Sequence, residues 1–136
     1  QPPPLRSILS EFGIARGETS MAPTNYAYTN HFLAAASQGT FAEGLASMLP
    51  CYWIYQEVGR DLVKRGSKDP AYQKWIDNYA GDEYSKSVAE VLAMMDAEAP
   101  RLSALQRNRC RELFTISARY EYLFWDMAWR KEQWAP

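Results

Sequence analysis

Residues 41–66 read FAEGLASMLPCYWIYQEVGRDLVKRG, and this stretch decides the fold class. Its larger apolar side chains recur every three or four residues, which is the spacing of one face of an α-helix. They are Phe41, Leu45, Met48, Tyr52, Tyr55 and Leu62, with Gly59 in the same row. Lys64 and Arg65 place positive charge in the last turn, and Gly66 is a common helix stop. The pattern predicts one long helix.

Pro50 lies inside this predicted helix. Proline has no backbone N–H, so it frees the carbonyl of Ala46 and favours a kink one residue before Cys51. Helix kinks are often found beside functional sites, so Cys51 and its neighbours become candidates for chemistry.

The rest of the chain shows the same helical spacing. It predicts helices over about 5–14, 23–38, 70–80 and 82–98, and a last helix from about 102 into the Trp-rich end. Pro100 separates the last two. No stretch shows sustained strand alternation, and there is no internal repeat. We therefore expect an all-α fold and one domain over 1–136, with the Pro-rich residues 1–4 as a linker or trimmed end.

Composition narrows the class of protein. The 15 Lys and Arg residues are balanced by 16 Asp and Glu, giving a net charge of -1 and no positive field for nucleic acid or an acidic membrane surface. The longest stretch without charged residues, 19–42, is too polar for a membrane span. The two cysteines are far apart and no signal segment is present. These features favour a soluble cytoplasmic protein with reduced thiols and with neither a nucleic acid nor a membrane as partner.

In the last predicted helix, Glu121 lies about 200° from Arg119 around the axis. Arg119 shares its face with other polar residues, and that face is expected to contact water. Glu121 instead falls among Phe114, Ser117, Ala118, Phe124, Trp125 and Ala128, on the face expected to be buried. Burial raises the pKa of a carboxyl group and suits it to acid and base catalysis. The alternative is a structural carboxylate held by a tyrosine or an arginine.

Cys51 and Tyr55 are four residues apart and therefore share a helix face. A thiol beside a phenol is a possible nucleophile with an orienting donor, although a free cysteine is more often a small buried hydrophobe. Cys110 has no such neighbours and is expected to be inert.

Several rings could form the wall of a site for a planar ligand, although such rows are more often simply core. They are Tyr28, Tyr79, Trp53, Trp75 and Trp125. His31 is the single histidine, so a multi-histidine metal site is excluded and a structural role is favoured. No glycine-rich phosphate loop, CxxC, HExxH or GxSxG motif is present.

Four segments resemble, in order and spacing, the TenA (thiaminase II) family. They are APTNYAYTNH at 22–31, MLPCYWIY at 48–55, WIDNY at 75–79 and YEYLFWDMA at 120–128. The resemblance implies a haem-oxygenase-like helical bundle without haem that commonly forms homotetramers. It also implies hydrolysis of 4-amino-5-aminomethyl-2-methylpyrimidine to the hydroxymethyl pyrimidine and ammonia in thiamin salvage, and in many members cleavage of thiamin. Neither a metal nor an organic cofactor is implied.

Residue by residue, the resemblance implies that Cys51 is the nucleophile and Glu121 the proton donor. It implies that Tyr55 and Tyr79 form hydrogen bonds to the substrate and that Tyr28 stacks on its ring.

The resemblance covers about the last two-thirds of a typical member, so the opening helices of the family are expected to be missing. Those helices supply an aspartate that pairs with the aminopyrimidine and an aromatic residue beside the nucleophile. The alternative to a cysteine-dependent hydrolase is therefore a catalytically silent helical module that binds a pyrimidine or a partner, for example the trailing part of a fusion with a thiamin-pathway kinase. A haem oxygenase is a weaker third hypothesis, because nothing around His31 marks it as a haem ligand.

Overall fold

A computed structural model of the chain describes residue 13 and residues 20–136, and these residues form an all-α bundle. The α-helices are α2 (Pro23–Gln38), α3 (Phe41–Leu62), α4 (Pro70–Ala80), α5 (Asp82–Glu98) and α6 (Ala104–Arg130), with a 3₁₀ turn, η1 (Ala99–Arg101), before α6. No strand is present in the described part of the chain, so the all-α prediction is confirmed. The helix expected over 5–14 lies outside the described residues, except for Gly13.

Local chemistry fixes where the helices begin. Asp69 caps α4 by accepting a hydrogen bond from the Ala71 N–H at 2.8 Å, and Pro70 follows as the first helical residue. Thr40 and Ser103 form capping boxes at the starts of α3 and α6. These contacts span only a few residues, which is why the sequence predicts these helix starts well.

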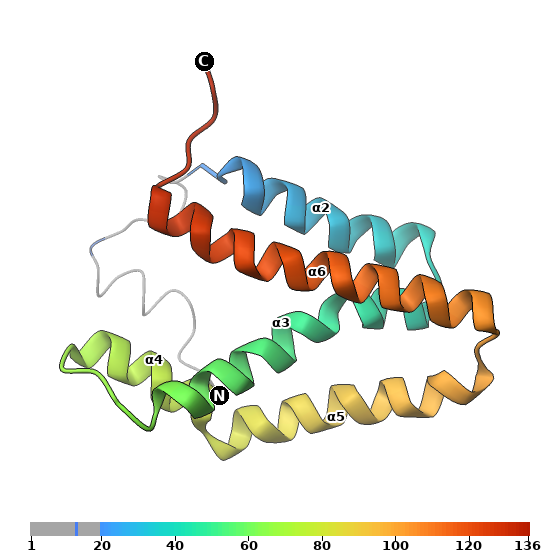
Figure 1. Ribbon diagram of the computed structural model, residues 1–136, viewed down its shortest axis with the longest axis horizontal. Helices are drawn as coiled ribbons and strands as arrows, with labels where there is room; N and C mark the ends of the chain where they lie inside the picture. Colours follow the sequence, from blue (N-terminus) through green and yellow to red (C-terminus); the bar gives the residue numbers. More distant parts are fainter. Residues whose placement is uncertain (1–12, 14–19) are drawn as a thin grey trace.

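Helix α3 is the centre of the bundle. It packs most extensively on α6 and also contacts α2, α4 and α5. Figure 1 shows α2 lying along one side of α6, with α3 crossing behind α6 and α5 running below. Residues on α3 can therefore meet side chains from α2, α4, α5 and α6, and the Cys51 region lies where these helices meet.

Small residues form much of the buried side of α3, although Leu49 and Gln56 are buried there as well. Ala42 and Ala46 pack with Leu102 and Cys110 in a buried cluster. Phe41 and Met48, which belong to the predicted apolar row, are exposed instead. Small side chains let the helices approach closely, so the larger ones are displaced to the edges of the contact. The row of large residues in the sequence is therefore a poor guide to the buried face of α3.

Helices α3 and α4 meet almost backbone to backbone at Gly59. A Cβ atom at this position would lie 2.7 Å from the carbonyl carbon of Tyr79 and 2.9 Å from the nitrogen of Ala80. Only glycine fits such a contact. The close approach brings Tyr55, one turn before Gly59, beside Tyr79 with ring centroids 5.1 Å apart.

Helix α6 presents Glu121 to the interior, as the sequence predicts, and Arg119 to solvent. Trp125 and Ala128, expected on the buried side, are exposed; Trp125 retains 47% of its accessible surface. The reason is that α2 and α3 cover only part of the apolar side of α6.

Candidate active site

Glu121 is the centre of the candidate site. Its side chain is only 3% exposed, and it accepts a hydrogen bond from the Tyr28 hydroxyl at 2.5 Å on Oε1. The two residues are 93 positions apart and come together because α2 lies alongside α6. A tyrosine therefore does hold this carboxylate, as the structural alternative expected. The same hydrogen bond is also compatible with a catalytic role for Glu121.

Two helices, α2 and α3, direct polar groups at the Glu121 carboxylate of α6. Burial raises the pKa of Glu121 above its ordinary value, while side-chain hydrogen bonds from Tyr28, Cys51 and Tyr55 oppose that rise. Tyr28 belongs to α2, and Cys51 and Tyr55 are one turn apart on α3. The structure thus brings together four of the five residues that the sequence singles out.

The Cys51 thiol is half-buried and sits against this carboxylate. Burial raises the pKa of Cys51 to about 11, and the negative charge and hydrogen bond of Glu121 act in the same direction. At neutral pH the sulfur therefore holds its proton and donates it towards Glu121. This arrangement suits a nucleophile that loses its proton to a neighbouring carboxylate only as it attacks.

We expect alkylation of Cys51 by iodoacetamide to be slow at neutral pH and to accelerate by about tenfold per pH unit towards its pKa of about 11. The thiolate is the reactive form, and burial beside Glu121 disfavours it. Peptide mass mapping of the native protein measures the rate, with Cys110 in the same digest as the internal control. Cys110 is buried and its pKa is also raised, so it should react only after unfolding. Alkylation of Cys51 at pH 7 as fast as a free cysteine would contradict this geometry.

An aromatic wall adjoins the thiol. Tyr79 lies between Tyr55 and Trp75, with ring centroids 5.1 Å and 4.5 Å away respectively. Trp125 completes the wall, 6.0 Å from Tyr55 and edge-on to Trp75 at 5.7 Å. Because Trp125 is half-exposed, the wall is open to solvent on that side. Rings with hydroxyl groups at this opening can stack on a planar ligand and form hydrogen bonds to its edge.

Two of the rings expected in the wall of the site, Trp53 and Tyr28, lie elsewhere. Trp53 lies outside this wall and instead lines a separate apolar groove of about 200 Å³ with Ile54, Val58 and Phe114. Tyr28 is also apart from it, since its ring stacks on Tyr120 at 5.1 Å. Rings on one helix diverge around its axis, so a list of aromatic residues does not determine which of them share a wall.

Tyr84 and Tyr120 contribute to the site in ways that the sequence does not reveal. The Tyr84 hydroxyl donates to the backbone carbonyl of Tyr52 at 3.1 Å and to that of Cys51 at 3.4 Å, so α5 supports α3 directly at the thiol. Tyr120 holds the ring of Tyr28. The only signal for Tyr84 is its inward position in the helical row of α5.

His31 has the structural role expected for it. Its Nε2 lies 2.9 Å from the hydroxyl of the fully buried Ser117, and burial lowers its pKa. Within residue 13 and residues 20–136, no group of three His, Cys, Asp or Glu side chains is arranged to hold a metal ion.

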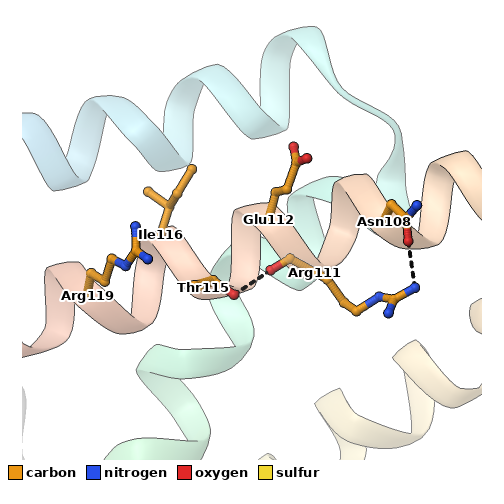
Figure 2. Close-up of a pocket in the computed structure, with 6 residues that line it drawn as sticks. All are labelled: Asn108, Arg111, Glu112, Thr115, Ile116 and Arg119. Atoms are coloured by element: carbon orange, nitrogen blue, oxygen red, sulfur yellow. Dashed lines mark hydrogen bonds between the residues drawn. The ribbon is translucent and has the colours of Figure 1, made fainter.

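A depression of about 560 Å³ lies on the exposed side of α6 (Figure 2). It is lined by Asn108, Arg111, Glu112, Thr115, Ile116 and Arg119, and Arg111 donates to Asn108 at 2.6 Å. All its lining residues come from one helix, and Glu121 is not among them. The candidate active site is therefore the buried cluster of Cys51, Glu121, Tyr28 and Tyr55 with its aromatic wall.

Comparison with known proteins identifies relatives that all belong to one family. The sequence profile of the TENA/THI-4/PQQC family matches residues 5–131. An aminopyrimidine aminohydrolase of Bacillus subtilis is 45% identical over 114 residues, covering 84% of this chain and 48% of its own length. One of Halalkalibacterium halodurans is 34% identical over 134 residues, covering 95% and 60% respectively. The chain therefore spans about half of the first relative and three-fifths of the second.

A solved structure is similar as well. The TenA homologue of P. horikoshii OT3 superposes with a TM-score of 0.81 at 29% identity, covering 91% of this chain and 59% of that one. The sequence match over most of the chain and the arrangement of the helices thus point to the same group of proteins.

Proposed function

The chain belongs to the TENA/THI-4/PQQC family, and from this premise we propose that it is an aminopyrimidine aminohydrolase of thiamin salvage. Its substrate would be 4-amino-5-aminomethyl-2-methylpyrimidine and its products the hydroxymethyl pyrimidine and ammonia, with thiamin as a second substrate. The observation that carries the proposal is the convergence of Cys51, Tyr28 and Tyr55 on the buried Glu121 carboxylate. No cofactor is part of the proposal.

In the proposed mechanism the Cys51 sulfur forms a bond to a carbon of the pyrimidine ring as its proton passes to Glu121, and the π electron pair of that carbon moves to a ring nitrogen. Glu121 then gives the proton to the leaving amine; the carbon–nitrogen bond breaks with its electron pair on nitrogen, and the pair held by the ring forms an exocyclic carbon–carbon double bond. Water adds its hydroxyl group to the exocyclic carbon, which returns the electron pair to the ring, and gives its proton to Glu121. The carbon–sulfur bond then breaks with its pair on sulfur, the ring double bond forms again, and the sulfur takes the proton from Glu121 to restore the thiol and release the hydroxymethyl pyrimidine. The net reaction consumes one water and produces one ammonia.

The tyrosines would hold the substrate during these steps. Tyr55 and Tyr79 would form hydrogen bonds to the ring edge from the aromatic wall. The resemblance gives Tyr28 a stacking role, and its hydrogen bond to Glu121 supports a second role in fixing the carboxylate. Burial raises the pKa of Tyr79 as well, so its hydroxyl keeps its proton and can donate at neutral pH.

Ammonia release from the aminomethyl pyrimidine tests the proposal. We expect Cys51→Ala to reduce turnover by about 1,000-fold or more, because water would have to attack directly. Cys110→Ala is the matched control, since it removes a thiol far from Glu121 and should keep the activity. Full turnover by Cys51→Ala would rule out the cysteine mechanism.

A catalytically silent, pyrimidine-binding module is the second candidate. The observation that favours it is that burial beside Glu121 raises the pKa of the Cys51 thiol and so disfavours the thiolate. Calorimetric binding of the aminomethyl pyrimidine without ammonia release would support this candidate over the hydrolase.

We also propose a homotetramer located in the cytoplasm. The exposed side of α6 carries Trp129, which is 87% exposed, and Tyr122, and burial of these rings between subunits would stabilise an assembly. Over residue 13 and residues 20–136, no helix has the length and apolar character needed to cross a membrane.

A further inference from the structure

Helix α2 begins without a cap of its own. Its N-cap residue is Ala22, whose side chain cannot accept a hydrogen bond. The side chain of Glu132 takes this role from the other end of the chain. Its Oε2 accepts from the Thr24 N–H at 2.9 Å and its Oε1 from the Thr24 hydroxyl at 3.1 Å. A carboxylate at a helix N-terminus is also favoured by the helix dipole.

The backbone after α6 directs Glu132 to this place. Lys131 has a left-handed conformation with φ of 52°, unusual for a residue with a side chain. The Glu132 N–H then donates to the Met127 carbonyl at 3.0 Å. Trp134 adds a second tie, because its indole N–H donates to the Met21 carbonyl at 2.8 Å. The segment after α6 is thus held across the start of α2.

We propose that Glu132 is a positioning residue that sets the Tyr28 hydroxyl against Glu121, acting through Thr24. Thr24 and Tyr28 are four residues apart, which is about one turn of α2, so a shift at Thr24 is transmitted along the helix to Tyr28. The 2.5 Å hydrogen bond between Tyr28 and Glu121 depends on this position.

The other contacts of Tyr28 do not fix the position of its hydroxyl group. Its ring stacks on Tyr120 with an interplanar angle of 13° and lies 4.3 Å from that of Phe32. These contacts involve the ring of Tyr28 and not its hydroxyl, so they do not by themselves fix the hydroxyl along the helix axis. A bidentate carboxylate at the first turn supplies that restraint.

Loosening Tyr28 should change how Glu121 titrates. The groups that face this carboxylate are Tyr28 from α2 and Cys51 and Tyr55 from α3, with Tyr79 and Tyr84 interacting from α4 and α5. The Tyr28 hydrogen bond lowers the pKa of Glu121, so its loss raises that pKa further. The reaction needs the ionised carboxylate to take the Cys51 proton. The acid limb of the pH–rate profile, where activity falls as pH is lowered, should therefore move to higher pH. This consequence rests on the proposed function.

The test compares Glu132→Ala with Glu112→Ala, which removes an exposed carboxylate of α6 that pairs with Arg109. Ammonia release and Cys51 alkylation are each followed against pH, together with the melting temperature. We expect Glu132→Ala to lower kcat by about 3- to 30-fold and to shift the acid limb upward, while Glu112→Ala does neither. Glu132→Gln keeps an acceptor for Thr24 and should restore most of the loss. In a Tyr28→Phe background, Glu132→Ala should have little further effect on the limb.

A lower melting temperature with an unmoved acid limb would overturn the proposal and leave Glu132 with a purely structural role. Effects of Glu132→Ala and Tyr28→Phe that simply multiply would overturn it as well. The alkylation profile needs no turnover, because ionisation of Glu121 affects its thiol neighbour directly. Wild-type protein without ammonia release would therefore defeat the proposed function, while the alkylation profiles would still decide the role of Glu132.

Discussion

Glu121→Gln is expected to reduce ammonia release by about 1,000-fold while leaving the fold at least as stable as the wild type at neutral pH. Glutamine keeps the shape and an oxygen that accepts from Tyr28, but it can neither take the Cys51 proton nor return it to the leaving amine. Steady-state kinetics measure the first effect. Glu112→Gln on the exposed side of the same helix is the matched control and should retain activity.

The stability effect of this substitution should depend on pH. The pKa of Glu121 is raised in the folded protein, so its protonated form is favoured by folding. That contribution is fully present below the ordinary carboxyl pKa and is lost as pH rises through the raised value. Urea unfolding at pH 4 and pH 8 should show Glu121→Gln gaining stability relative to the wild type as pH rises. A difference that shrinks with pH would contradict the burial of an unfavourable charge at this site.

Gly59→Ala is expected to destabilise the fold by about 2–3 kcal/mol, a large effect for one added methyl group. The new Cβ would lie 2.7 Å from the backbone of Tyr79, and a backbone atom cannot rotate away as a side chain can. Gly44→Ala is the matched control in the same helix, because its nearest atom would be 3.6 Å away. It should be neutral or stabilising by about 0.5–1 kcal/mol, since alanine favours helix. Equal stability of the two variants in urea would show that α3 and α4 do not meet so closely.

The same substitution should also damage the site. Pushing α4 away from α3 moves Tyr79 and Trp75 relative to Tyr55, whose rings form the wall beside Cys51. We expect the KM for the aminomethyl pyrimidine to rise more than kcat falls, because the thiol and Glu121 are held by other helices. Tryptophan fluorescence of the folded variant provides an independent measure of the disturbed wall.

Much of the fold follows from short stretches of sequence. The bounds of α4 and α5 and the caps at Asp69, Thr40 and Ser103 depend on residues within one turn of each other. Helical periodicity also places Glu121 on the buried side of α6, and a four-residue spacing places Cys51 beside Tyr55. These features are local, so the chain specifies them before any helix meets another.

The candidate site is less predictable than the helices that carry it. Trp53 and Trp125 are both tryptophans on apolar rows, yet only Trp125 adjoins Tyr55 and Trp75. The apolar row of α3 also misplaces Phe41 and Met48, because small residues rather than large ones make the close helix contacts. Periodicity gives the face of a helix, but only packing decides which part of that face is covered.

The sequence by itself thus determined five helices within residues 20–136, the inward position of Glu121 and the pairing of Cys51 with Tyr55 on one helix face. It also contains four segments in the order found in the TenA family. The tertiary structure decided that Tyr28 donates to Glu121 across 93 residues, that Glu132 caps α2 across 108, and that burial beside Glu121 raises the pKa of Cys51. The physical reason is one of range. Helix periodicity and capping act over one or two turns, whereas pKa values and long-range hydrogen bonds depend on which surfaces the packed helices bury together.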